Sequence, residues 1–131
     1  MCREACRAMS DKATVGEVVA AFLENCGVGS AFGVISIHTL PFLDAIGQRG
    51  KIRYVCARGE AGAVNMADAY ARVGQRLGVV FTSTGTAAGN ASGALVEAQA
   101  AGTSLLHITG QVEAQYLDQD CGYIHGARDQ L

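Results

Sequence analysis

The stretch IRYVCARGEAGAVNMADAYARVGQRLGVVFTSTG, residues 52–85, decides the fold because its side-chain pattern changes twice. Residues 52–57 form a short apolar run, residues 60–74 repeat small and apolar side chains at helical spacing, and residues 76–83 form a second apolar run. This order predicts a strand, a helix and a second strand. Two strands joined by a helix in this way predict a parallel pair with a right-handed crossover.

The same alternation continues on both sides of this unit. A helix is predicted from Thr14 to Gly27, with Thr14 and Glu17 forming a capping box at its start. A strand over residues 30–35 and a helix within residues 36–50 follow, with Pro41 tolerated in the first turn. Beyond the central unit, a helix within 85–102 precedes a strand over 104–109.

The predicted fold class is α/β. The strands are short and continuously apolar, as expected when helices cover both faces of a sheet. We therefore predict a three-layer α/β/α domain with a mostly parallel sheet, made by residues 13–131 and incomplete at its C-terminal end. Residues 1–12 are predicted to be a tail.

Composition excludes several classes of protein. A chain of 131 residues with half its side chains apolar and only 17% charged is one globular domain, not a disordered tail. The net charge is −2 and the basic residues are scattered, so the sequence has no cluster of positive charge that would bind nucleic acid or an anionic membrane. The uncharged run 77–96 is rich in Thr, Ser, Gly and Asn, which favours a strand and a helix over a membrane span.

The five cysteines form no CxxC pair, and the first ten residues contain no apolar stretch typical of a signal peptide. These features favour reduced thiols in a cytoplasmic protein. We expect Cys26 and Cys56 to fill small spaces in the core.

The carboxyl ends of the predicted strands form the edge where ligands bind in parallel α/β sheets. Glu60 lies at this edge, at the start of a helix, among Gly and Ala residues. Two roles are open for it: complementing the helix dipole, or pairing with a ligand. A second glycine-rich turn, at Gly85, follows the next predicted strand. Two adjacent strand ends then carry only small side chains, which leaves room for a ligand and favours the second role for Glu60. At Gly89 and Gly93 we predict close packing of helices instead.

Other familiar sites are not supported. The chain has no P-loop motif, and Gly27, Gly29 and Gly33 fit a helix cap and turn better than a dinucleotide fingerprint. The three histidines lie far apart, so no metal ligand set is predicted. His107 lies within a predicted strand and is interpreted as a core histidine.

At these positions the chain resembles the pyrimidine-binding domain of thiamine diphosphate-dependent enzymes, in the acetolactate (acetohydroxyacid) synthase-like branch. The usual His-Glu-Gln-Gly-Ala and Ala-Asp-Gly-Tyr-Ala-Arg motifs match residues 59–63 and 67–72. The usual Thr-Ser-Gly-Pro-Gly-Ala-Thr-Asn motif corresponds to residues 83–90, with Thr86 where Pro is usual, and Thr-Gly-Gln-Val is identical at 109–112. The resemblance runs from about Thr14 to Leu131.

The resemblance implies a role for each matched residue. The matched glutamate, Glu60, would hydrogen-bond N1′ of the pyrimidine and favour the imino tautomer that removes the C2 proton of the thiazolium. The activated cofactor then adds to a 2-keto acid, which loses carbon dioxide before an acceptor is attacked. The further cofactor-binding residues implied are Gly85, Thr86, Asn90 and Gln111.

The chain departs from the family pattern in two ways. The first-strand loop, usually Tyr-Pro-Gly-Gly, is Val34–Ile37 here, so the resemblance implies a lyase, decarboxylase or carboligase of unassigned substrate. The family binds magnesium and the diphosphate in a separate domain through Gly-Asp-Gly and a later Asn, whereas this chain contains no Gly-Asp pair.

These departures set three further expectations. The chain is expected to be a piece of a longer protein and inactive alone, with Mg²⁺ bound elsewhere. A homodimer or larger oligomer is expected, because the family places its cofactor between subunits and a truncated sheet leaves edges uncovered. The alternative is a non-catalytic α/β ligand-binding or assembly module derived from the same fold.

Overall fold

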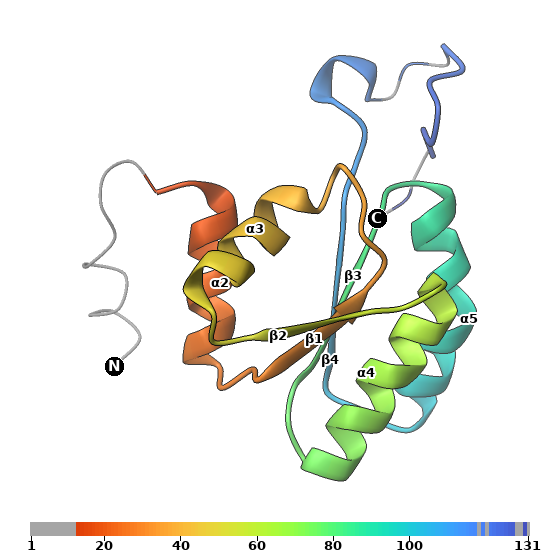
Figure 1. Ribbon diagram of the computed structural model, residues 1–131. Helices are drawn as coiled ribbons and strands as arrows, with labels where there is room; N and C mark the ends of the chain where they lie inside the picture. Colours follow the sequence, from red (N-terminus) through yellow and green to blue (C-terminus); the bar gives the residue numbers. More distant parts are fainter. Residues whose placement is uncertain (1–12, 118, 120, 128–129, 131) are drawn as a thin grey trace.

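The computed structural model describes residues 13–117, 119, 121–127 and 130, so the predicted tail of residues 1–12 lies outside the described residues. The elements alternate in the predicted order (Figure 1). They are α2 (Val15–Asn25), β1 (Ser30–Gly33), α3 (Leu40–Arg49), β2 (Arg53–Cys56), α4 (Glu60–Gly74), β3 (Gly78–Thr82), α5 (Thr86–Ala100), β4 (Leu105–Thr109) and the 3₁₀ turn η2 (Ala114–Tyr116).

The four strands form one sheet in the order β2-β1-β3-β4, and every neighbouring pair is parallel. Helices α2 and α3 cover one face of the sheet, and α4 and α5 cover the other (Figure 1). The predicted three-layer α/β/α fold is therefore confirmed.

Strand β3 supplies both halves of the core. Its five residues are all buried, and successive side chains point to opposite faces of the sheet. Val79 and Phe81 pack in the cluster under α2 and α3, whereas Val80 packs with small residues of α4 and α5. This explains why β3 has no polar alternation in its sequence.

Helix α2 begins with the predicted capping box. The side chain of Thr14 accepts a hydrogen bond from the backbone N–H of Glu17, at 3.2 Å. In return, the backbone N–H of Thr14 donates to Glu17 Oε2 at 2.6 Å. Both N-terminal amides are thereby satisfied, which fixes where the helix starts.

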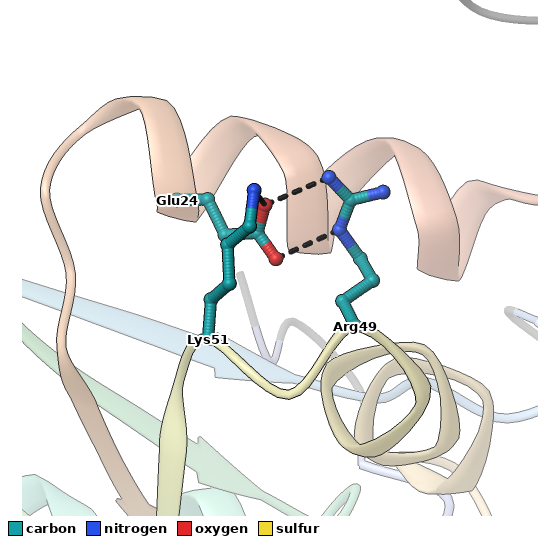
Figure 2. Close-up of polar contacts among 3 residues, drawn as sticks. All are labelled: Glu24, Arg49 and Lys51. Atoms are coloured by element: carbon teal, nitrogen blue, oxygen red, sulfur yellow. Dashed lines mark hydrogen bonds and ion pairs between the residues drawn. The ribbon is translucent and has the colours of Figure 1, made fainter.

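An ion-pair cluster joins α2 to α3 (Figure 2). Arg49 donates two hydrogen bonds to the carboxylate of Glu24, at 2.8 and 2.7 Å, and Lys51 Nζ lies 3.4 Å from Glu24 Oε2. The Arg49 guanidinium holds the pKa of Glu24 below its ordinary value. The cluster therefore ties the C-terminal end of α2 to the C-terminal end of α3.

Two predictions about side-chain packing are wrong. Cys26 and Cys56 are exposed rather than in the core, because Cys26 caps the solvent-facing end of α2 and Cys56 lies on the edge strand β2. Gly89 and Gly93 are not in close helix packing. A Cβ added at either would meet no described atom within 4 Å, because both positions face outward from α5.

Candidate cofactor site

Because all four strands are parallel, the segments that follow them meet at one edge of the sheet. These segments are residues 34–39 after β1, 57–59 after β2, 83–85 after β3 and 110–112 after β4. Helices α4 and α5 both begin at this edge, and the first turn of α4 contacts the second turn of α5.

Glu60 is the first residue of α4 and is half-buried. Its Oε2 atom accepts a hydrogen bond of 3.3 Å from Asn90 Nδ2, in the second turn of α5. Gly59 precedes it in an extended conformation and makes no side-chain cap, so Glu60 is the acidic group at this helix start. The structure thus brings together two of the predicted site residues.

Gly85 forms the turn between β3 and α5. Its φ of 60° and ψ of −114° place it in a region that favours glycine, and it is buried. A Cβ at this position would collide with the backbone carbonyl of His125. The turn therefore requires glycine for its conformation and also for the close approach of another segment.

Thr86 opens α5, one helical turn before Asn90, so the two side chains share a face of the helix. Thr86 is exposed, and its hydroxyl lies 3.3 Å from His125 Nδ1. The row of polar groups along this face runs from His125 through Thr86 and Asn90 to Glu60.

Gln111 lies two residues beyond β4 at the same edge. Its side-chain oxygen accepts a hydrogen bond of 2.8 Å from the backbone N–H of Val112, so this carbonyl faces its own segment. The structure places Gln111 near the edge without joining it to Glu60 or to the Gly85 turn.

Two residues at this edge were missed by the sequence analysis. His125 contacts Gly85 and Thr86, and the side chain of Gln130 accepts a hydrogen bond from the Gly85 N–H at 2.8 Å. Gln130 lies 45 positions after Gly85 in the chain, and no local pattern indicates that the segment returns to this turn.

His107 lies in β4 and bonds within the sheet. Its Nε2 atom is 2.7 Å from Thr82 Oγ1 on β3, and burial lowers the pKa of the imidazole. This agrees with its interpretation as a satisfied core histidine. Among the described residues, no three His, Cys, Asp or Glu side chains are grouped so that they could hold a metal ion.

With this geometry established, comparisons with known proteins identify the family. Residues 13–131 match the sequence profile of the thiamine pyrophosphate enzyme N-terminal TPP binding domain. The chain belongs to this family. The match covers every described element and includes the α4 and α5 starts at which Glu60 and Asn90 meet.

Members of the family with similar sequences include decarboxylases and synthases. The chain is 37% identical over 117 residues to a Pseudomonas aeruginosa protein described as "Probable 2-ketoarginine decarboxylase AruI", covering 89% of this chain and 21% of that protein. It is 34% identical over 107 residues to the acetolactate synthase isozyme 1 large subunit of Escherichia coli, covering 82% of this chain and 19% of that protein.

A solved structure has the same arrangement of elements. The thiamine diphosphate-dependent 4-hydroxybenzoylformate decarboxylase of Rhodococcus jostii superposes with a TM-score of 0.79 and 29% identity. The alignment covers 89% of this chain and 21% of that one. The chain therefore spans about a fifth of the length of these relatives.

Proposed function

We propose that this chain is the pyrimidine-binding domain of a longer thiamine diphosphate-dependent enzyme that acts on a 2-keto acid by decarboxylation or carboligation. The observation that carries the proposal is the hydrogen bond from Asn90 to Glu60 at the carboxyl edge of the sheet. This bond supports the proposal because a half-buried carboxylate that a neighbouring amide holds in place can share a proton with a ring nitrogen.

The residues at this edge fit the pyrimidine of the cofactor. Glu60 supplies the carboxylate for N1′, and Asn90 holds that carboxylate from the neighbouring helix. Gly85 is proposed to shape the turn at this site, Thr86 is proposed to face the ring, and Gln111 is proposed at the outer margin of the site. The polar groups face one edge, and the positive end of the α4 dipole favours a negative charge on Glu60.

Thiamine diphosphate, when bound, supplies an electron sink for loss of carbon dioxide. The part of this chain is to hold and move a proton. Glu60 can share a proton with a ring nitrogen at Oε1 while Oε2 keeps its bond to Asn90, so the carboxylate keeps its orientation during the exchange. Helices α4 and α5 carry these groups on rigid elements rather than on a loop.

The names of the relatives support the proposed substrate class, and the loop after β1 supplies apolar surface at the same edge of the sheet. Two relatives bear the names of decarboxylases and one of an acetolactate synthase. In this chain the loop carries Ile35 and Ile37, which are 56% and 77% exposed. We propose a 2-keto acid substrate and assign the full-length protein to the lyases or transferases.

The diphosphate and Mg²⁺ are proposed to bind a separate domain, which makes this chain inactive alone. A cytoplasmic location is proposed from the cysteine pattern, since the five cysteines include no CxxC pair. In the part of the chain that the structure describes, no helix has both the length and the hydropathy needed to cross a bilayer.

A homodimer or larger oligomer is proposed from one face of the α4–α5 layer. Gly62, Gly89 and Gly93 lie within these helices, and a Cβ at each would meet no described atom within 4 Å. Glycine inside a helix costs about 0.5–1 kcal/mol relative to alanine, so a reason for glycine is expected. Close approach of another subunit or domain supplies that reason.

The direct test is calorimetric titration of thiamine diphosphate with Mg²⁺ into the full-length protein and into this chain alone. Saturable binding by the full-length protein, weak or absent in the isolated chain, supports the proposal. No binding by either favours a non-catalytic module of the same fold. The reading frame beyond Leu131 provides a second check, since it should encode Gly-Asp-Gly and a later Asn.

A further inference from the structure

The side-chain amide of Gln130 bridges the ends of two neighbouring strands. Its Oε1 atom accepts hydrogen bonds from the Gly85 N–H at 2.8 Å and from the Thr84 hydroxyl at 3.4 Å. Its Nε2 atom donates to the backbone carbonyl of Gly110 at 2.9 Å. Figure 1 shows the segment after β4 returning above the start of α5.

The two backbone groups that Gln130 bonds are ones that regular structure leaves free. The pairing of β3 with β4 ends at Thr82 and Thr109, so the Gly110 carbonyl lies beyond it. Gly85 is the N-cap of α5, where an N–H has no partner within the helix. An amide can serve both groups because it is a donor and an acceptor at once, which neither a carboxylate nor an ammonium is.

The same glycine sets where α5 begins. Gly85 has a positive φ, and its N–H is held by Gln130 while its Cα side is closed by the His125 carbonyl. Five residues later, α5 carries Asn90, which bonds Glu60. A shift of the Gly85 turn would therefore move Thr86 and Asn90 relative to Glu60.

We propose that Gln130 is a positioning residue of the pyrimidine site, which acts by clamping the Gly85 turn to the end of β4. The proposal rests on the proposed function, because it assigns Gln130 a part in cofactor binding. Gln130 itself does not need to touch the cofactor, since both ends of its amide are already bonded to the protein.

The test uses Gln130→Ala and Gln130→Glu in the full-length protein, with Gln119→Ala as the matched control. Gln119 is exposed in the same segment and donates to the Gln115 carbonyl instead. Gln130→Ala removes the hydrogen bonds to Gly85 and Gly110. Because such bonds change an equilibrium constant by about a factor of ten, we expect the variant to bind thiamine diphosphate about tenfold more weakly. Hydrogen exchange at the Gly85 amide should also accelerate, with or without cofactor.

Gln130→Glu provides a signature that a general loss of stability does not. At pH 8 the ionised carboxylate can accept from Gly85 but places a second acceptor against the Gly110 carbonyl. A protonated carboxyl regains one donor. Affinity relative to the wild type at the same pH should therefore be low at pH 8 and recover as the pH falls towards the ordinary carboxyl range.

The outcomes separate this inference from the proposed function. If the wild-type protein binds thiamine diphosphate and all three variants bind equally well, the role of Gln130 is overturned and the proposed function stands. If the wild-type protein does not bind the cofactor, both fail together. Weakened binding in the Gln130 variants alone, with pH recovery in Gln130→Glu, supports the positioning role.

Discussion

Asn90, in the second turn of α5, donates a 3.3 Å hydrogen bond to the carboxylate of Glu60, which begins α4. Two helices that follow different strands are therefore joined near their starts. A helix dipole attracts a carboxylate in the first turn but does not require an amide from a neighbouring helix. The bond orients one oxygen of Glu60 and leaves the other available to a ligand.

Replacing Asn90 with Asp should move the acidic limb of the pH–activity profile to higher pH. The substitution keeps the size of the side chain but sets a second carboxylate beside Glu60, and two like charges at this distance disfavour ionisation. Asn25→Asp, at the exposed end of α2, adds the same charge on the other face of the sheet and is the control. Identical profiles for wild type and Asn90→Asp would contradict the pairing.

Replacing the outward glycines should separate stability from assembly. Gly89→Ala and Gly93→Ala should each stabilise the isolated chain by about 0.5–1 kcal/mol, since they improve helix propensity without a clash. In the full-length protein the added methyl groups should weaken association, measured by light scattering at micromolar concentration.

Gly47→Ala is the matched control for this pair of variants. Gly47 lies in α3 on the opposite face of the sheet, and a Cβ there also meets no described atom within 4 Å. It should stabilise the chain similarly and leave association unchanged. Unaltered association in all three variants would argue against the α4–α5 face as an interface.

His107 should make stability depend on pH between neutral and mildly acid conditions. Burial lowers its pKa in the folded state below the ordinary value, so the unfolded chain binds more protons in the interval between the two values. Stability is therefore complete above the unfolded pKa of about 6.5 and is lost as the pH falls through that value towards the folded pKa.

Urea midpoints of wild type and His107→Gln, measured from pH 8 to pH 5, test this expectation. Glutamine can still bond the Thr82 hydroxyl but does not titrate, so the slope with pH over this range should be smaller in the variant. Equal slopes would assign the pH dependence to other groups.

The architecture could be predicted because its determinants are local in the sequence. The helix over Glu60–Gly74 follows from the spacing of small residues, and the α2 start follows from Thr14 and Glu17, which lie within one turn of each other. The buried run of β3 likewise indicates its central place in the sheet. In each case the residues that make the interaction are close together in the chain.

What could not be predicted depends on residues far apart in the chain or on which way a side chain faces. Gln130 reaches Gly85 across 45 positions, and nothing in either local sequence encodes that contact. The packing assigned to Gly93 required knowing which side of α5 meets α4, and small residues on all sides of that helix leave the spacing ambiguous. The exposed Cys56 depended on the strand order, which places β2 at the edge.

The exchange rate of the C2 proton of bound thiamine diphosphate, in the full-length protein and its Glu60→Gln variant, tests the central claim most directly. Glutamine keeps the size and a hydrogen-bonding tip but cannot exchange a proton with N1′, so loss of a positioned acid–base group predicts exchange about 10²–10⁴-fold slower. Thermal stability, measured in parallel, should change little. Unchanged exchange with a lowered melting temperature would show that Glu60 only complements the helix dipole, and would contradict the account.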